Sequence, residues 1–110
     1  MIAPLPFERR SDARPGPPRL DRDQAEQIAR TLRAIADPTR LQLLSMIQGS
    51  ALGEATVSDL ALELGVTQPT VSHHMRIMLD DGLVIGDQRG RQTWYSIHPD
   101  RRAAVDDLLQ

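Results

Sequence analysis

Two short amphipathic stretches, residues 59–64 and 68–80, constrain the fold of this chain more than any other feature of its sequence. Gly65 lies directly after the first stretch, where a tight turn needs a residue that adopts a positive φ at little cost. Ser58 and Thr67 are favourable N-caps, since their hydroxyls can accept a hydrogen bond from the first turn of a helix. The sequence therefore predicts two short helices joined by a sharp turn.

Helical spacing gives the second of these helices two chemically different faces. The apolar side chains recur at intervals of three and four residues and are expected to pack on the core; they are Val71, Met75, Met78 and Leu79. The opposite face and the first turn carry polar side chains that can hydrogen bond to base edges or phosphates; they are Gln68, Thr70, Ser72, His73 and Arg76. We predict that these five residues contact DNA, whereas His74 flanks the apolar face and is predicted to be packed and hydrogen bonded.

The remaining elements extend this helical pair into a larger pattern. We expect further helices over residues 21–36, 38–48 and 99–110, a short strand at 56–57, and strands at 83–85 and 92–97. The resulting fold class is mainly α with a small β-hairpin. Its element order, α-α-β-α-α-β-β-α, is that of a winged helix-turn-helix.

The polar segment between the last two predicted strands, residues 86–91, forms the tip of the expected hairpin. Arg89 and Arg91 flank Gly90 there, so two guanidinium groups would lie on a glycine-bent tip. Such a tip can contact the phosphates beside a major groove, or a narrow minor groove. We predict that Arg89 and Arg91 are the residues through which this hairpin, the wing of the fold, contacts DNA.

Proline divides the chain into a tail and a folded domain. Five prolines in residues 1–20 preclude a regular helix or strand, so this Pro- and Arg-rich segment is predicted to be a disordered tail. Its arginines leave open whether it is inert or contacts DNA. Asp21 and Gln24 form a capping-box pattern that begins the first helix. The DNA-binding domain is expected to span residues 21–98, and residues 99–110 are expected to add a short helix that contributes to dimerisation.

The first predicted helix has an apolar stripe that is wide for one small core, so we expect two copies of the chain to share it as a homodimer. The residues predicted at this interface are Ile28, Leu32, Ile35, Val105 and Leu108. A dimer would place two copies of the 68–80 helix about one DNA turn, roughly 34 Å, apart. That spacing predicts an operator with inverted repeats.

Composition excludes several other functions. The chain has no cysteine and no lysine, no glycine-rich phosphate loop and no nucleophile elbow, so we expect no enzyme activity. Its net charge of −2 is unusual for a DNA-binding domain, although all 13 basic residues are arginine. The sequence shows neither a secretory signal nor an apolar run of the roughly 20 residues that a membrane span needs, and we expect a cytoplasmic protein with no membrane partner.

Three motifs together resemble one family of bacterial repressors. The segments 34–44, 68–76 and 94–97 are similar to the corresponding segments of the arsenical-resistance, or ArsR/SmtB, family. The resemblance implies a homodimer that binds a double-stranded operator, represses transcription, and releases the DNA when a small effector binds. It also implies that the polar residues of the 68–80 helix contact bases or phosphates.

The chain departs from this family at the positions that bind metals. Thr56 and Ser58 stand where arsenic- and cadmium-sensing members have cysteines, and a hydroxyl is a poor ligand for a thiophilic ion. The last helix also lacks the Asp and His pairs of the zinc-, nickel- and cobalt-binding members; it offers only His98, Asp100, Asp106 and Asp107. We therefore predict no metal site and no cofactor, and leave the effector open. The alternative function is a winged-helix interaction module, an antitoxin or adaptor with weak or no DNA binding.

Overall fold

Helix α3 (Pro38–Gln48) lies at the centre of the computed structural model, which describes residues 19–110. The carboxylate of Asp37 caps this helix by accepting a hydrogen bond from the N–H of Arg40 at 3.0 Å. Pro38 occupies the first turn, where its missing N–H costs nothing. The side chains of Leu43, Leu44 and Ile47 are fully buried and form the middle of an aliphatic core.

Helices α4 (Val57–Leu64) and α5 (Gln68–Asp80) form the predicted helix-turn-helix. Gly65 ends α4 with φ 78°, and its N–H donates to the carbonyl of Ala61 at 2.9 Å. The bounds of α5 and its Thr67 N-cap are confirmed. The prediction that Ser58 caps α4 is wrong. The hydroxyl of Thr56 accepts the capping hydrogen bond from the N–H of Asp59 at 3.2 Å, so α4 begins two residues earlier than expected.

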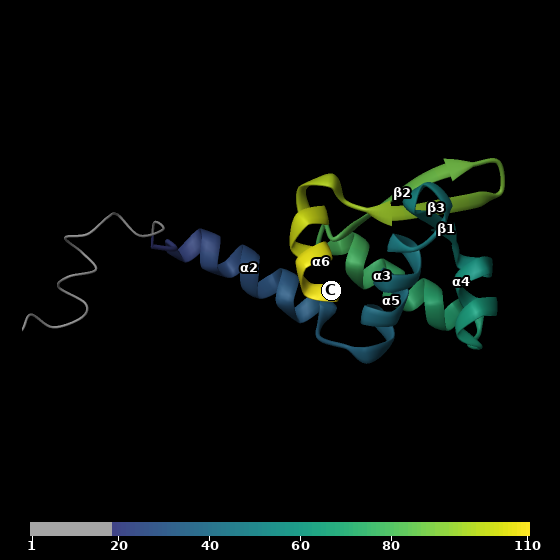
Figure 1. Ribbon diagram of the computed structural model, residues 1–110, viewed down its shortest axis with the longest axis horizontal. Coiled ribbons are helices and arrows are strands. Elements are labelled where there is room, and N and C mark those ends of the chain that lie inside the picture. The colour runs from purple at the N-terminus through teal and green to yellow at the C-terminus, as the bar shows by residue number, and fades with distance from the viewer. Residues whose placement is uncertain (1–18) are drawn as a thin grey trace, which may run out of the picture.

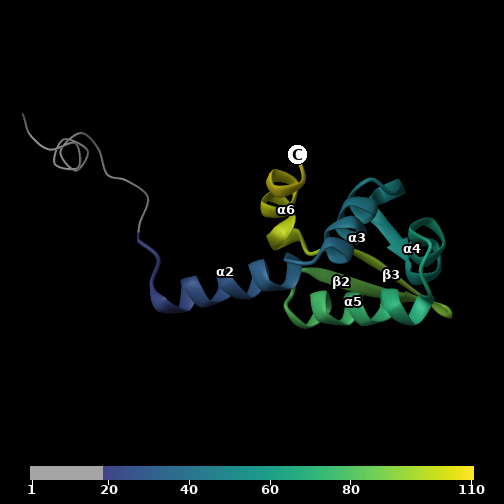
Figure 2. The same cartoon turned by 90° about the horizontal axis from the view of Figure 1, so that it is seen from below.

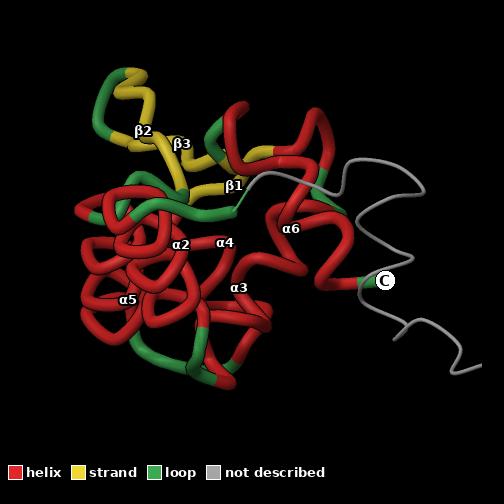
Figure 3. Tube along the Cα trace, turned by 90° about the vertical axis from the view of Figure 1, so that its left-hand side faces the viewer, coloured by secondary structure: helices red, strands yellow, loops and turns green. Residues whose placement is uncertain are grey.

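Three short strands form an antiparallel sheet in the order β1–β3–β2: β1 (Glu54–Thr56), β2 (Val84–Arg89) and β3 (Gln92–Ile97). The strand predicted at residues 56–57 therefore lies earlier in the chain, at Glu54–Thr56, and Val57 already belongs to α4. The predicted hairpin tip at 86–91 is too long, because strand pairing continues to Arg89 opposite Gln92 and only two residues remain in the turn. The hairpin projects beyond the helices as the wing (Figure 1), and the sheet lies on one side of them (Figure 3).

Helix α2 (Arg22–Ile35) begins with the predicted capping box, in which Asp21 and Gln24 exchange side-chain-to-backbone hydrogen bonds. Most of this helix projects from the packed body, as two perpendicular views show (Figures 1 and 2). Ile28 and Leu32 are consequently 46% and 53% exposed. The only buried residues of α2 are its last two, Ala34 and Ile35, so the helix carries an apolar stripe that one copy of the chain does not cover.

Helix α6 (Arg102–Leu109) follows the short 3₁₀ turn Pro99–Arg101 and packs where α2 joins the body (Figure 1). Leu108 is exposed, as expected of an interface residue. Val105 and Ile35 are buried in the core of the single chain, so their predicted place on the dimer surface is wrong. Within residues 19–110, no helix is long and apolar enough to cross a membrane. The predicted tail, residues 1–20, falls almost entirely outside the described range.

Candidate nucleic-acid interface

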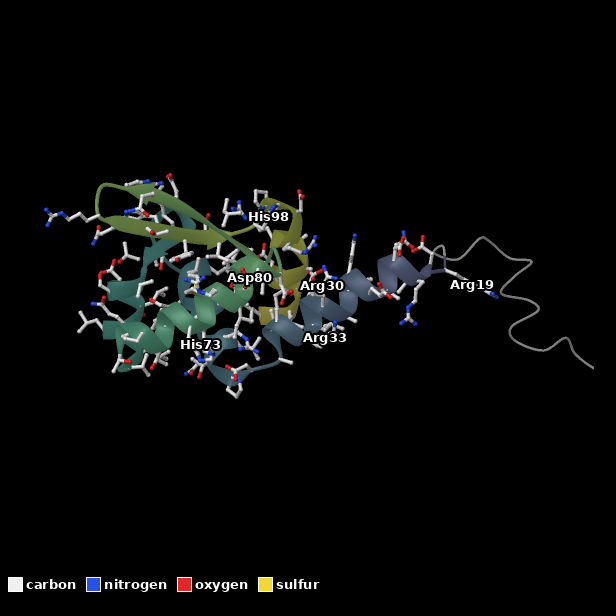
Figure 4. The ribbon with its side chains drawn as sticks, turned by 180° about the vertical axis from the view of Figure 1, so that it is seen from behind. Arg19, Arg30, Arg33, His73, Asp80 and His98 are labelled. Atoms are coloured by element: carbon white, nitrogen blue, oxygen red, sulfur yellow. The ribbon has the colours of Figure 1, made fainter. Side chains whose placement is uncertain are left out.

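The outer face of α5 is polar and exposed along its N-terminal half. Thr67 fixes the start of the helix, because its Oγ1 accepts from the N–H of Thr70 at 3.3 Å. In Figure 4, His73 lies on the side of α5 that is turned away from the hairpin. All five residues predicted to contact DNA are exposed; they are Gln68, Thr70, Ser72, His73 and Arg76. The structure thus presents them together, within about two helical turns.

The inner face of α5 holds the helix on the core. Val71, Met75 and Met78 have no exposed surface, as their spacing predicts. Leu79 was predicted with them but is 37% exposed. It lies roughly 100° around the helix axis from Met78, at the edge of the apolar face.

A polar cluster joins α5 to the start of α3. The Nδ1 atom of His74 lies 3.4 Å from Nη1 of Arg40 and 3.9 Å from Oδ2 of Asp37. Arg40 also donates from Nε to the carbonyl of Ala34 at the end of α2. The hydrogen bond from the N–H of Arg40 lowers the pKa of Asp37, and the charges of Arg40 and His74 act in the same direction. His74 is therefore packed and hydrogen bonded, as predicted, and links α5 to the α2–α3 junction.

A groove of about 270 Å³ separates the N-terminal half of α5 from the hairpin. Ser72 and Gln68 line its α5 side, and Arg91 lies at the end of the hairpin side. Among residues 19–110, Arg91 forms no salt bridge. The groove is mostly polar, with hydroxyls from both sides, and its lining is completed by Thr56, Val57, Ser58, Gln92, Thr93 and Tyr95. A free guanidinium beside such a groove is suited to a phosphate group.

Arg89 is bound differently from Arg91. Its Nη1 and Nη2 atoms donate to the two carboxylate oxygens of Glu54 at 2.8 and 2.9 Å, and its Nε donates to Asp87 at 2.8 Å. The hydrogen bonds to Glu54 and Asp87 raise the pKa of the Arg89 guanidinium. The expectation that Arg89 lies on the bent tip is wrong, because Arg89 is the last residue of β2 and its guanidinium already has carboxylate partners.

The sequence did not indicate Glu54 as a partner of the wing. The pairing of Arg89 with Asp87 could have been found, since residues two apart on a strand share a face. Glu54 comes close to Arg89 only because β1 pairs with β3 on the side opposite β2, and nothing local in the sequence reveals that pairing.

The residues that the family resemblance suggested comparing with metal ligands form hydrogen bonds within the chain. Thr56 is buried and caps α4, and its Oγ1 lies 3.3 Å from the hydroxyl of Ser58. Asp106 accepts a hydrogen bond from Gln48, and Nδ1 of His98 accepts from the N–H of Asp100 at 3.1 Å. Across the described part of the chain, no three His, Asp or Glu side chains are grouped so as to hold a metal ion.

Comparison with known proteins gives consistent matches. Residues 37–85 match the sequence model of bacterial regulatory proteins of the arsR family. The chain is 40% identical over 94 residues to the HTH-type transcriptional regulator NmtR of Mycobacterium tuberculosis, covering 86% of this chain and 75% of NmtR. It is 31% identical over 85 residues to the arsenical resistance operon repressor of Staphylococcus aureus, covering 77% of this chain and 76% of that repressor.

Solved structures show the same architecture. The homodimeric winged helix-turn-helix DNA-binding domain of Mb0332 from Mycobacterium bovis, determined by solution NMR, superimposes with a TM-score of 0.68 at 30% sequence identity. The similarity covers 86% of this chain and 87% of that domain.

Proposed function

The chain belongs to the ArsR family of transcriptional repressors, which are DNA-binding proteins and not enzymes, and we propose that it acts as a homodimer on an inverted-repeat operator. One observation carries the proposal: α5 is anchored by Val71, Met75 and Met78 while its polar outer face stays exposed beside the hairpin groove. Such a helix can enter a major groove without moving from its place on the core.

The outer face of α5 carries the chemistry that distinguishes base pairs. The Gln68 amide can pair with adenine, and the Arg76 guanidinium can pair with N7 and O6 of guanine. Thr70, Ser72 and His73 offer further hydrogen bonds to bases or phosphates. Arg91, at the end of the groove between α5 and the hairpin, would contact a phosphate, since its guanidinium has no carboxylate partner within residues 19–110.

The exposed apolar stripe of α2 supports dimerisation. Ile28 and Leu32 on α2 and Leu108 on α6 are all exposed in the single chain. Ile35 and Val105 lie beneath this surface and would support it from the core. The related domain from Mycobacterium bovis is homodimeric. A second copy of this chain would remove the stripe from water.

We propose that the effector is not an ion bound by thiolates. The chain contains no cysteine, and the hydroxyl of Thr56 is committed to the cap of α4. Arsenite binds thiolates because they are soft donors, and a hydroxyl does not replace them. Release from the operator would therefore depend on a different ligand class.

The Arg76→Ala substitution should weaken binding to the operator much more than binding to unrelated DNA. A lost bidentate contact to guanine costs roughly fivefold to a hundredfold in affinity, whereas a lost phosphate contact weakens both DNAs alike. The operator can be obtained by selection from a random pool, and affinities can be compared by fluorescence anisotropy. Arg102→Ala, an exposed substitution on α6, should leave both affinities unchanged. Equal losses on both DNAs for Arg76→Ala would contradict base recognition by this residue.

The Leu32→Glu substitution should convert the protein from a dimer to a monomer at micromolar concentration, because it places two carboxylates in the shared apolar surface. Sedimentation equilibrium measures this directly. Leu62→Glu is the matched control, since Leu62 is exposed on α4, away from α2. Dimers of equal stability for both variants, or a monomeric unmodified protein, would exclude the proposed interface.

Arsenite at concentrations stoichiometric with the protein should leave the operator complex intact, because the chain has no thiolate to bind it. Anisotropy of a labelled operator during an arsenite titration is the measurement, with high salt as the positive control for dissociation. Stoichiometric release by arsenite would refute the argument from the missing cysteines.

A further inference from the structure

The two arginines of the wing lie on opposite faces of the hairpin. Arg91 opens onto the groove that Ser72 and Gln68 of α5 line. The Cζ atom of Arg89 instead lies 5.4 Å from the ring centre of Trp94. Trp94 belongs to a different groove, which residues of β1 and α4 line. The arginines therefore face different surroundings, although only one residue separates them.

Strand register explains how Arg89 reaches across the sheet. Asp87 on β2 pairs with Trp94 on the central strand β3, and Trp94 pairs with Thr56 on β1. Directly paired residues share a face of the sheet, as do residues two apart on one strand. Glu54, Trp94, Asp87 and Arg89 therefore lie on one face, and the Arg89 side chain crosses above Trp94 from one edge strand to the other.

The charge balance of this cluster disfavours contact with DNA. One guanidinium directs three of its nitrogen atoms to two carboxylates, so the cluster carries a net charge of −1. The Glu54 side chain is only 17% exposed and makes a bidentate pair with Arg89. Two of the five N–H groups of Arg89 remain, but a phosphate that paired with the guanidinium in the bidentate position would have to displace that carboxylate, at the cost of leaving it largely buried and unpaired.

We propose that Arg89 is a positioning residue that fixes the wing against the helix-turn-helix and does not itself contact DNA. Glu54 lies two residues before Thr56, the N-cap of α4, so the Arg89–Glu54 pair joins the far end of the hairpin to the start of the helix-turn-helix. The pair thereby sets the distance between Arg91 and the outer face of α5. This inference rests on the proposed DNA-binding function, and it changes the role expected of Arg89.

DNA binding as a function of salt distinguishes the two roles of an arginine. The logarithm of the affinity falls as the logarithm of the salt concentration rises. Arg91→Ala should make this fall shallower, reducing the magnitude of the slope by about 1 for each wing in contact with DNA. Arg89→Ala and Glu54→Ala should each weaken binding several-fold with an unchanged slope, and the double variant should be no weaker than the worse single variant. An Arg89 that contacts phosphate gives the opposite pattern: Arg89→Ala reduces the magnitude of the salt slope, and Glu54→Ala tightens binding because it removes a competing carboxylate. That pattern would overturn the proposal.

A measurement without DNA tests the contact itself. Trp94 is the only tryptophan of the chain, so its fluorescence reports on this cluster alone. Arg89→Ala and Glu54→Ala should each shift its emission to longer wavelength as the ring gains contact with water, whereas Arg91→Ala should not. Unchanged emission in both of the first two variants would refute the positioning role of the Arg89–Glu54 pair, whatever the DNA result. Failure of the unmodified protein to bind any selected DNA, with the emission shifts present, would refute the proposed function and leave the contact of Arg89 and Glu54 with Trp94 supported.

Discussion

Burial of one side of α5 is the constraint on which the rest of the structure depends. Val71, Met75 and Met78 are completely removed from water, and each such side chain contributes roughly 1.5–3 kcal/mol of burial free energy. Because these residues repeat every three to four positions, their burial fixes the rotation of the helix about its axis. The polar residues between them are thereby turned outward, which gives the chain a rigid polar surface next to the hairpin. Recognition of DNA would use this orientation as it stands.

The parts of the fold that could be predicted from the sequence are those set by local chemistry. Asp21 and Thr67 cap helices as expected, and Gly65 adopts the left-handed conformation that the turn requires. The ArsR-family resemblance is confirmed by relatives aligned along most of the chain. The polar face of α5 was also predictable, because helical periodicity alone determines which residues lie opposite the core.

The errors concern features that depend on tertiary contacts. The cap of α4 moved from Ser58 to Thr56 because β1 pairs with β3 and ends there. Ile35 and Val105 belong to an apolar stripe, but periodicity does not tell which part of a stripe the chain buries by itself. Arg89 and Arg91 both flank Gly90, so the local sequence gives them the same surroundings. Only the strand order brings Glu54 to Arg89. In each case the deciding partner lies far away along the chain.

Chemical protection of the operator tests the central claim, that the outer face of α5 lies in the major groove, most directly. Dimethyl sulfate methylates guanine at N7 in the major groove, where a side chain such as that of Arg76 would bind. We predict that bound protein protects N7 of guanines in two half-sites whose centres are about one helical turn, roughly 34 Å, apart. Reactive N7 atoms throughout the site, with protection of the sugar–phosphate backbone alone, would contradict it.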